Sequence, residues 1–424
     1  MDSPKIIIRG GKRLTGKVKI SGSKNATLPI LAATILIPEP ITLTNLPSLV
    51  DIETMCEVLN LLGANVEGKK ESAVINTVSL DQYEAPYEQV RKMRASALVM
   101  GALLARFGKA YVPLPGGCNI GLRPINLHLD GLSKLGAEIV TKEGYVKLSA
   151  KKLIGTEIYL DFPSVGATEN LMMATSMACG KTIIDNAAKE PEIVELANFL
   201  NKAGAKIEGA GSDTIKVTGV KELKSTSFQI IPDRIETGTY AIAAAITKGD
   251  ITLEGADFDH LHTVMTKLEE AGVIFEKKDA QMRVYVKKDL MPANIRTMPY
   301  PGFPTDLQAQ FMTLMSITKG MSMVIESVFE NRFMHVSELC RMGADIKVDG
   351  HTAIIRGVET LSGAQVNATD LRASAALILA GLVAKGETQL SGIHHLDRGY
   401  ECMEEKLSRL GAQIKRIAGG KDYD

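Results

Sequence analysis

The sequence predicts an α/β protein in which buried helices are surrounded by β-sheets and six units of about 70 residues repeat along the chain. Three observations indicate this fold class: a short phrase that recurs six times, a second helix in each unit that is apolar on nearly all sides, and short β-rich runs between them. At 424 residues the chain exceeds one usual hydrophobic core, which favours two or three domains.

The recurring phrase ends an amphipathic helix and begins a strand. It reads LLGANVE, KLGAEIV, KAGAKIE, EAGVIFE, RMGADIK and RLGAQIK. Its glycines lie 68 to 73 residues apart, at Gly63, Gly136, Gly204, Gly272, Gly343 and Gly411. Glycine at this place is typical of the C′ position of a helix. Helices such as DIETMCEVLNLLGA, PEIVELANFLNKAGA and DRGYECMEEKLSRLGA should each keep one face in solvent.

The second helix of each unit should be buried on every side. After a polar start, these helices read NATLPILAATIL, RASALVMGALLARFG, ATENLMMATSMACG, GTYAIAAAITKG, LQAQFMTLMSITKG and RASAALILAGLVAKG. Strands such as KVKISG, AYVPLP, KTIIDNA, DITLEG and ETQLSG would close sheets around them. Because each unit supplies one fully buried helix, two domains of three units fit the length better than one core of six.

Charge and cysteine content exclude several classes of protein. The 49 basic and 49 acidic residues cancel, and no run of like charges predicts a nucleic-acid or membrane-surface tail. The apolar runs are shorter than the roughly 20 residues that span a bilayer, and the N-terminal one is too short for a signal peptide, so we expect a cytoplasmic protein without membrane insertion. The five cysteines are widely spaced, which predicts neither a disulfide framework nor a metal pair.

The starts of the buried helices carry polar side chains. They read Ser23-Lys24-Asn25, Met93-Arg94-Ala95-Ser96, Ser164-Val165-Gly166, Asp233-Arg234-Ile235-Glu236, Pro304-Thr305-Asp306 and Thr369-Asp370-Leu371-Arg372. Unpaired amides at helix N-termini together with Lys24, Arg94 and Arg372 favour a phosphate or carboxylate guest. N-capping is the alternative for the hydroxyl and acidic residues, but it does not explain the cations.

One cysteine has an unusual setting. Cys118 lies in PGGCNIGLRP, among three glycines that permit loop closure, whereas Cys56, Cys179, Cys340 and Cys402 lie in helical sequence. We interpret Cys118 as a reactive thiol and the other four as small hydrophobic fillers, which is also the alternative for Cys118. His128 follows on the next helix, but no cysteine-protease signature is present.

No cofactor motif is present. The adjacent His394 and His395 lack a third ligand at metal spacing, and neither a P-loop nor a GxGxxG motif occurs. We therefore expect no metal and no organic cofactor.

Nine segments together resemble the UDP-N-acetylglucosamine 1-carboxyvinyltransferase family of enolpyruvyl transferases. They are SGSKNATLP, YEQVRKMRAS, LPGGCNIGLRP, SVGAT, PDRIETGT, FPTDLQAQF, VFENRFMHV, TDLRASA and DRGYE, in family order from about Gly22 to Tyr400. PGGC and VFENRFMH distinguish this family from 5-enolpyruvylshikimate-3-phosphate synthase, which shares the sixfold repeat. The resemblance implies a two-domain inside-out α/β barrel, with residues 22–231 in one domain, 1–21 and 232–424 in the other, and the active site in the cleft.

The resemblance also implies a reaction. The enolpyruvyl group of phosphoenolpyruvate would pass to the 3′-hydroxyl of UDP-N-acetylglucosamine with release of phosphate, the first committed step of peptidoglycan synthesis. Cys118 would protonate C3 of phosphoenolpyruvate and would be the target of fosfomycin. Asp306 would accept the hydroxyl proton, with N-capping as a compatible role. Lys24, Arg123 and Arg398 would hold the phosphate and carboxylate of phosphoenolpyruvate, although Arg398 alone would read as a solvated helix residue.

Further site positions follow from the resemblance only. Asn25 and Arg94 would also contact phosphoenolpyruvate, and Asp370 and Arg372 would support the charged network with Asn25. The sugar nucleotide would be bound by Arg94, Arg123, Ser164, Val165, Gly166, Asp306, Val328 and Phe329. Some family members carry lysine where this chain reads Asp161-Phe162-Pro163. The sister enzyme acting on shikimate 3-phosphate and a catalytically silent sugar-nucleotide-binding protein are the alternatives.

Overall fold

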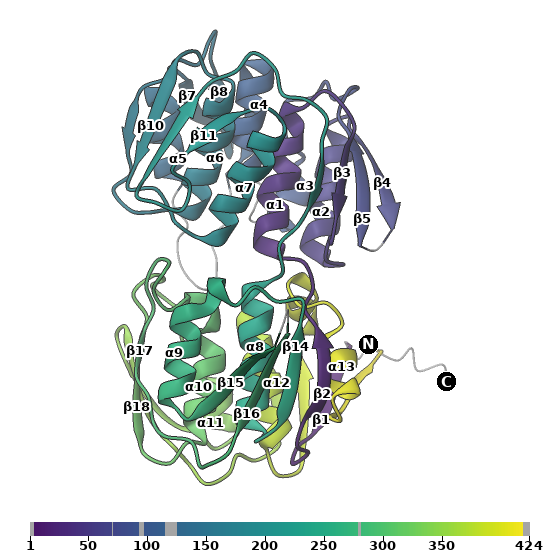
Figure 1. The fold of residues 1–424 in the computed structure, drawn as a ribbon, viewed down its shortest axis with the longest axis vertical. Helices are drawn as coiled ribbons and strands as arrows, with labels where there is room; N and C mark the ends of the chain where they lie inside the picture. The colour runs from purple at the N-terminus through teal and green to yellow at the C-terminus, as the bar shows by residue number, and fades with distance from the viewer. Residues whose placement is uncertain (1–3, 70, 93–96, 115–124, 279–280, 419–424) are drawn as a thin grey trace. The chain divides into compact units, whose positions relative to one another are not determined.

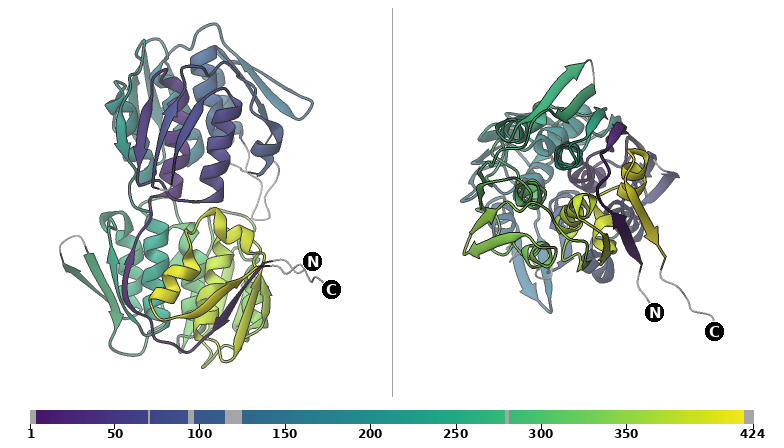
Figure 2. Two further views of the ribbon diagram at one scale, coloured as in Figure 1. Left: turned by 90° about the vertical axis from the view of Figure 1, so that its right-hand side faces the viewer. Right: turned by 90° about the horizontal axis from the view of Figure 1, so that it is seen from below.

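The computed structural model describes residues 4–69, 71–92, 97–114, 125–278 and 281–418. The described residues form two compact units, one within 22–231 and the other from 4–21 together with 232–418. In each unit helices lie in the centre and strands at the periphery (Figure 1, Figure 2). The predicted layering of buried helices inside and sheets outside is therefore confirmed.

The unit within residues 22–231 is built around α1 (Lys24–Ala33), α4 (Val99–Phe107) and α6 (Val165–Ser176). Its sheets have the orders β13-β3-β5-β4, β6-β8-β7 and β11-β12-β10-β9 among the described residues. Those strands are β3 (Ile41–Thr44), β4 (Asn65–Lys69), β5 (Ser72–Asn76), β6 (Lys109–Pro113), β7 (Glu138–Lys142), β8 (Tyr145–Ser149), β9 (Glu157–Tyr159), β10 (Lys181–Asp185), β11 (Lys206–Glu208), β12 (Thr214–Thr218) and β13 (Ser227–Gln229).

The other unit is built around α8 (Arg234–Ile246), α10 (Gln308–Ser316) and α12 (Leu371–Val383). Its sheets have the orders β15-β16-β14-β2, β17-β18-β20-β19 and β21-β22-β1-β23 in the part of the chain that is described. Those strands are β1 (Lys5–Arg9), β2 (Thr15–Lys19), β14 (Asp250–Glu254), β15 (Val273–Lys278), β16 (Gln281–Val286), β17 (Ile295–Arg296), β18 (Met321–Ile325), β19 (Asp345–Asp349), β20 (Thr352–Arg356), β21 (Gln365–Asn367), β22 (Glu387–Ser391) and β23 (Gln413–Ile417).

The first two strands of the chain join sheets whose other strands come much later in the sequence. β1 lies between β22 and β23 and is antiparallel to both. β2 is parallel to β14 and completes the sheet of the fourth repeat. The N-terminal segment is thus part of the C-terminal unit.

The six repeat glycines take the conformation that a helix C′ position requires. All have positive φ, between 94° and 108°. Each ends a helix that packs over the neighbouring sheet: α2 (Val50–Leu61), α5 (Asn126–Lys134), α7 (Pro191–Lys202), α9 (His262–Glu270), α11 (Val336–Arg341) and α13 (Met403–Arg409). A left-handed backbone conformation costs little free energy only for glycine. Glycine therefore recurs at these six positions because the end of each helix requires that conformation.

Two expectations about these helices were wrong. α7 is buried along most of its length because it packs against α1 and α6, so a solvent face remains only at Asn198, Asn201 and Lys202. The segment DRGYECMEEKLSRLGA is not one helix. It divides into a 3-10 helix, η5 (Ile393–Arg398), and α13, with a turn between them in which Cys402 has φ 45°.

The filler role assigned to four cysteines was also wrong for three of them. Cys179, Cys340 and Cys402 are exposed, because they lie in a turn after α6, on the outer face of α11 and in the turn before α13. Cys56 on α2 is partly buried. Burial, followed by the charges of Glu53 and Glu57, raises the pKa of its thiol to about 11, so it is poorly reactive at neutral pH.

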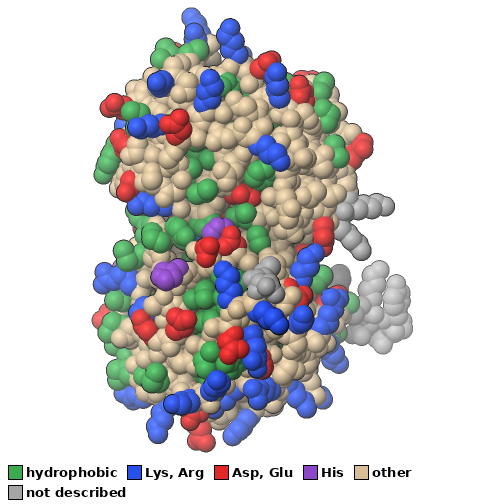
Figure 3. Space-filling view, viewed as in Figure 1, with side chains coloured by type: hydrophobic (Ala, Val, Ile, Leu, Met, Phe, Trp, Pro, Cys, Tyr) green, Lys and Arg blue, Asp and Glu red, His purple; other side chains and the backbone are tan. Residues whose placement is uncertain are grey.

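On the face drawn in Figure 3, basic and acidic side chains occur over both units, and basic ones predominate over the lower part of the view. Among the described residues, no helix is both long enough and apolar enough to cross a membrane.

Candidate active site

Asp306 is the centre of a buried charged cluster in the C-terminal unit. It lies in the 3-10 helix η4 (Thr305–Leu307), which leads into the buried helix α10. Its Oδ1 accepts from Nη2 of Arg332 at 2.7 Å, and its Oδ2 accepts from Nη2 of Arg372 at 2.8 Å. The Arg332 and Arg372 side chains are only 7% and 5% exposed and that of Asp306 is 25% exposed, so the two buried guanidinium charges depend on this partly exposed carboxylate for compensation.

These contacts define the protonation state of Asp306. Burial alone would raise the pKa of its carboxyl, but the charges of Arg372 and Arg332 and their hydrogen bonds outweigh burial and hold that pKa well below its usual range. The expected N-capping role is wrong, because the side chain caps neither η4 nor α10. At the start of the helix, the carboxylate instead accepts hydrogen bonds from two arginines.

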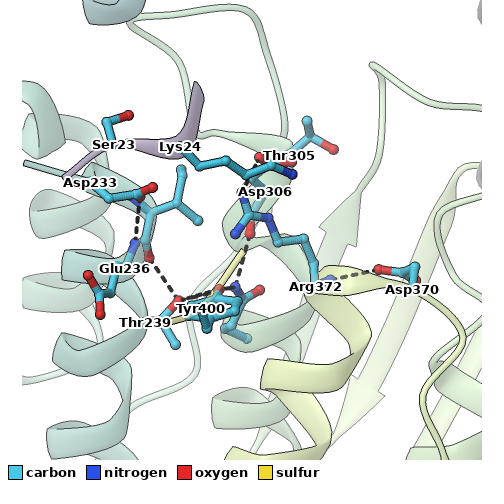
Figure 4. Close-up of polar contacts among 12 residues, drawn as sticks. Ser23, Lys24, Asp233, Glu236, Thr239, Thr305, Asp306, Asp370, Arg372 and Tyr400 are labelled. Atoms are coloured by element: carbon cyan, nitrogen blue, oxygen red, sulfur yellow. Dashed lines mark hydrogen bonds and ion pairs between the residues drawn. The ribbon is translucent and has the colours of Figure 1, made fainter. Parts of the chain in front are cut away.

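Arg372 is held from a second side by Tyr400 (Figure 4). Its guanidinium lies over the Tyr400 ring, 5.5 Å from the centroid. The phenol oxygen of Tyr400 lies 2.9 Å from Oγ1 of Thr239 and accepts from Nε2 of Gln310 at 3.0 Å. Burial raises the pKa of the Tyr400 phenol, which keeps it protonated as a hydrogen-bonding group.

Asp370 supports Arg372 through the backbone. It is the N-cap of α12, and its Oδ1 accepts from the amides of Arg372 at 2.8 Å and Ala373 at 3.0 Å. This cap fixes the first turn of the helix and hence the direction in which the Arg372 side chain leaves it. Asp306 of η4 and the pair Asp370 and Arg372 at the start of α12 therefore come together from two segments of this unit. The third member of the predicted supporting network, Asn25, belongs to the other unit.

Lys24 begins the buried helix α1 in the other unit. Its Nζ lies 2.7 Å from Oδ2 of Asp51 on α2, and the two side chains are 9% and 5% exposed. Ser23 caps the helix by accepting from the amide of Ala26 at 3.3 Å. Asn25 follows Lys24 and is partly exposed. A buried ammonium at a helix N-terminus is placed against the helix dipole, which is costly unless a carboxylate compensates.

The start of α6 is a second helix N-terminus in the same unit. Ser164 is its N-cap, and its Oγ accepts from the amide of Ala167 at 3.3 Å. Val165 and Gly166 form the first turn and are partly exposed. Their amides have no acceptor among the described residues, as expected for the first turn of a helix.

Val328 and Phe329 follow β18 in a tight turn. The amides of both donate to Oε1 of Glu326, at 2.9 and 3.1 Å. The guanidinium of Arg332 lies 4.9 Å from the centroid of the Phe329 ring, and its Nη1 donates to Oγ1 of Thr305. This turn is therefore connected to the Asp306 cluster through Arg332.

Arg398 is the last residue of η5, in the turn before α13. The preceding residue, Asp397, pairs with Arg416 of β23 through both carboxylate oxygens, and Arg416 also contacts Glu404. The reading of Arg398 as a solvated residue on an amphipathic helix is thus wrong in its secondary structure, and an ion-pair network holds the turn that carries it.

Three predicted site residues, Arg94, Cys118 and Arg123, lie outside the described residues. Within the part of the chain that is described, no group of three or more His, Cys, Asp or Glu side chains could hold a metal ion. A groove of about 330 Å³ runs between α5 and β9 and is lined by Leu127, Asp130, Lys134, Tyr159 and Asp161. It contains none of the predicted site residues.

The structure adds two residues that sequence reasoning missed. Arg332 and Tyr400 lie within the quoted segments VFENRFMHV and DRGYE, yet neither had been assigned a role. An arginine beside a segment assigned to substrate binding was an available signal for Arg332. The role of Tyr400 depends on contacts with α8 and α10, which no local pattern predicts.

Comparison with known proteins identifies the family to which this chain belongs. The model of the EPSP synthase family (3-phosphoshikimate 1-carboxyvinyltransferase) matches residues 8–407. A solved structure of the enolpyruvyl transferase NikO from Streptomyces tendae superposes with a TM-score of 0.90 at 26% identity, covering 99% of this chain and all of that one. EPSP synthase from Acinetobacter baumannii has the same fold, with a TM-score of 0.77 at 19% identity and coverage of 98% of this chain and all of that one. The chain belongs to the EPSP synthase family.

Sequence relatives narrow the class further. UDP-N-acetylglucosamine 1-carboxyvinyltransferase 2 of Carboxydothermus hydrogenoformans is 56% identical over 416 residues, covering 98% of this chain and 99% of that protein. UDP-N-acetylglucosamine 1-carboxyvinyltransferase of Geotalea uraniireducens is also 56% identical, over 97% of this chain and 99% of that protein. The resemblance stated from the sequence motifs is therefore confirmed, and so is the expected fold class.

Proposed function

We propose that this protein transfers the enolpyruvyl group of phosphoenolpyruvate to the 3′-hydroxyl of UDP-N-acetylglucosamine and releases phosphate, as the first committed step of peptidoglycan synthesis. The observation that carries the proposal is the 56% identity, over nearly the whole chain, to relatives named for this activity. The sister activity on shikimate 3-phosphate has weaker support, since the solved EPSP synthase is only 19% identical. We also propose a cytoplasmic location.

Phosphoenolpyruvate presents a phosphate and a carboxylate, and both need cationic partners. In this proposal Lys24, Arg123 and Arg398 hold these groups, with Asn25 and Arg94 completing the contacts. Support for Lys24 comes from its position at the start of α1, where the amides of the first turn add positive potential. Its pairing with Asp51 balances its charge before any substrate binds.

The reaction is an addition followed by an elimination. In the addition, the sugar 3′-oxygen bonds to C2 while C3 gains a proton, which we assign to Cys118. In the elimination, C3 loses a proton and the bond between C2 and the phosphate oxygen breaks, so phosphate leaves and the enol is restored. We assign the proton of the 3′-hydroxyl to Asp306.

If Asp306 accepts the hydroxyl proton, its contacts with Arg332 and Arg372 must change during the reaction. A carboxylate paired with two guanidinium groups is a weak base, because each pair stabilises the ionised form. For Asp306 to accept a proton, at least one of Arg332 and Arg372 must exchange its contact for an oxygen of the substrates. Asp370, which caps the first turn of α12, then limits where the Arg372 side chain can go.

The sugar nucleotide is assigned to the start of α6 and to the turn after β18. Ser164, Val165 and Gly166 would face its diphosphate through the first-turn amides. Val328 and Phe329 would lie beside the sugar, with Arg94, Arg123 and Asp306 as further contacts. The segment Asp161-Phe162-Pro163 has no lysine, which some family members carry there, so the amides would carry more of the recognition here.

Phosphate release from the purified protein tests the proposal. The assay supplies phosphoenolpyruvate with UDP-N-acetylglucosamine or with shikimate 3-phosphate, and fosfomycin serves as the inhibitor control. Release that requires the sugar nucleotide and stops with fosfomycin supports the proposal. Release with shikimate 3-phosphate alone would assign the sister reaction, and no release with either acceptor would favour a silent binding protein.

A further inference from the structure

The three buried helices of the C-terminal unit are followed by similar turns. After α8, α10 and α12 the chain reads Thr247-Lys248-Gly249, Thr318-Lys319-Gly320 and Ala384-Lys385-Gly386. β14, β18 and β22 begin directly after these turns, and all three lysines are exposed. The repeat therefore places one exposed lysine at the carboxyl end of each buried helix, about 70 residues apart in the sequence.

Two of these turns meet at one carboxylate. Nζ of Lys248 lies 2.7 Å from Oδ1 of Asp289, in the segment that follows β16. The hydrogen bond and charge of Lys248, and then the charge of Lys319, lower the pKa of the Asp289 carboxyl. The turns after α8 and α10 are thus close together at one end of the unit.

Two further loops bring exposed cations to the same end. Residues 10–14 carry Lys12 and Arg13, and the backbone of this loop is hydrogen-bonded to the last turn of α12 and to the start of β14. Lys287 and Lys288 follow β16, whose last residues pair with the first residues of β14. We call the exposed Lys and Arg side chains of these two loops and of the three turns the basic end.

The charge of the basic end is largely uncompensated. Apart from Lys248, none of its cations forms an ion pair with a described residue. Cations elsewhere on this unit are paired with carboxylates, as in Arg9–Glu387, Arg283–Asp250 and Arg416–Asp397. The acidic side chains in these loops and in the neighbouring turn after β20 are Asp289 and Glu359. The chain as a whole has no net charge, so positive charge is concentrated here. In Figure 3, basic side chains predominate over the lower part of this unit.

We propose that the basic end binds an anionic phospholipid surface as a peripheral contact, without a membrane-spanning segment. The inner leaflet of a cytoplasmic membrane has a negative surface potential, and each lysine or arginine held near it strengthens binding roughly fivefold. Several such side chains on one face are therefore enough for a reversible contact. This inference goes beyond the proposed reaction and does not depend on it.

The uncharged residues favour lipid over nucleic acid. Met291 and Met321 follow the lysines of this end and are 55% and 58% exposed. Flexible apolar side chains among lysines suit the boundary between headgroups and acyl chains. Single-stranded nucleic acid is bound mainly by stacking on aromatic side chains. Among the described residues, the large exposed aromatic side chains are Tyr87, Tyr159 and Phe162, and all belong to the other unit.

Sedimentation of the purified full-length protein with lipid vesicles tests the proposal. The wild type should bind vesicles that contain phosphatidylglycerol, should not bind vesicles of phosphatidylcholine alone, and should be released by high salt. The double variant Lys287→Gln, Lys288→Gln should bind roughly 30-fold more weakly, at about fivefold for each lysine. Both lysines are exposed and outside the proposed active site, so its Tm and its phosphate release should equal those of the wild type.

The matched control lies at the other end of the same hairpin. Lys277 and Lys278 are also adjacent and exposed, and Lys278 pairs with Gln281 where Val273 pairs with Val286 near the basic end. Five residues of strand separate the two ends by roughly 16 Å, which exceeds the Debye length of about 8 Å at physiological salt. Lys277→Gln with Lys278→Gln should therefore bind anionic vesicles as the wild type does.

Several results would overturn the inference. Failure of the wild type to bind anionic vesicles is one, and an equal loss of binding in the two lysine variants is another. A single- or double-stranded oligonucleotide that binds more tightly than the vesicles, with vesicle binding unaffected by Met291→Gln and Met321→Gln, would assign the surface to nucleic acid. If phosphate release fails in the wild type while vesicle binding follows the expected pattern, the proposed function fails and this inference stands.

A measurement on the wild type alone remains decisive if the variants do not fold. Lysine amines are labelled with an acylating reagent in the presence and absence of anionic vesicles, and the labelled peptides are quantified by mass spectrometry. Vesicles should slow the labelling of Lys287, Lys288 and Lys319, and leave that of Lys277 and Lys278 unchanged. Equal protection of all five, or of none, would overturn the contact.

Discussion

Replacing Asp306 with asparagine should destabilise the C-terminal unit, because it removes the charge shared by Arg332 and Arg372. Asparagine retains one acceptor oxygen, but its NH₂ group faces the second guanidinium as a donor facing a donor. Breaking a buried ion pair by removing one partner costs about 3–5 kcal/mol. Both arginines keep other contacts, to Thr305 and over the rings of Phe329 and Tyr400, so we expect about 3 kcal/mol.

Thermal unfolding measures this loss. For a unit of this size, about 3 kcal/mol corresponds to a fall in Tm of roughly 6–12 °C. The matched control is Asp345→Asn on β19, whose carboxylate pairs with Arg356 at 3.7 Å with side chains 46% and 70% exposed. That exposed pair should contribute less than about 1 kcal/mol. Inorganic phosphate should raise the Tm of the Asp306 variant more than that of the wild type, since it can bridge the two unpaired guanidinium groups.

Two outcomes would refute this reasoning. Equal Tm values for the Asp306 and Asp345 variants would mean that the buried pairs add nothing beyond a surface pair. A variant more stable than the wild type would mean that the cluster is under net electrostatic strain. In either case, turnover should still be compared with calorimetric binding of the sugar nucleotide, because a base should affect turnover by about 10²–10⁴-fold and binding far less.

The remaining predictions concern the thiol and a buried acid. Cys118→Ser should nearly abolish phosphate release, whereas Cys118→Asp should retain activity because a carboxylic acid can donate a proton; a fully active serine variant contradicts the acid role. Fosfomycin should add its mass to the peptide containing Cys118, and an adduct on another cysteine excludes that assignment. Burial raises the pKa of Glu195 to about 7, against the opposing hydrogen bond from the amide of Ile231. The folded protein then holds this proton more tightly than the unfolded chain, so stability falls as pH rises from about 4.5 to 7, by about 3 kcal/mol from this group. Glu195→Gln should flatten that part of the stability curve in urea titrations, and identical curves for the two proteins would contradict the shift.

The repeat could be predicted because its signals are local. A glycine at a helix C′ position, an apolar helix and a β-rich run each constrain only their own few residues. The starts of the buried helices were equally readable, so the positions of Lys24, Ser164 and Asp370 at helix N-termini are as expected.

The failures concern properties that depend on distant parts of the chain. The burial of α7 comes from its contacts with α1 and α6, and its own pattern of apolar residues looks like that of any surface helix. Asp306 has the sequence signature of a cap, but Arg332 and Arg372 are stronger partners than the helix amides. The role of Tyr400 likewise depends on Thr239 and Gln310, which are 161 and 90 residues away in sequence.

The position of β1 between β22 and β23 governs the order in which this chain can fold during synthesis. Residues 22–231 contain a complete unit and can fold while the rest is still being made. The apolar run Ile6-Ile7-Ile8 must instead wait for both of its hydrogen-bonding partners, which end near residue 417. About 400 residues at about 5–20 residues per second give a delay of roughly 20–80 s. Throughout that time the backbone N–H and C=O groups of β1 remain without their native partners, so the sheet β21-β22-β1-β23 forms only after nearly the whole chain has been made.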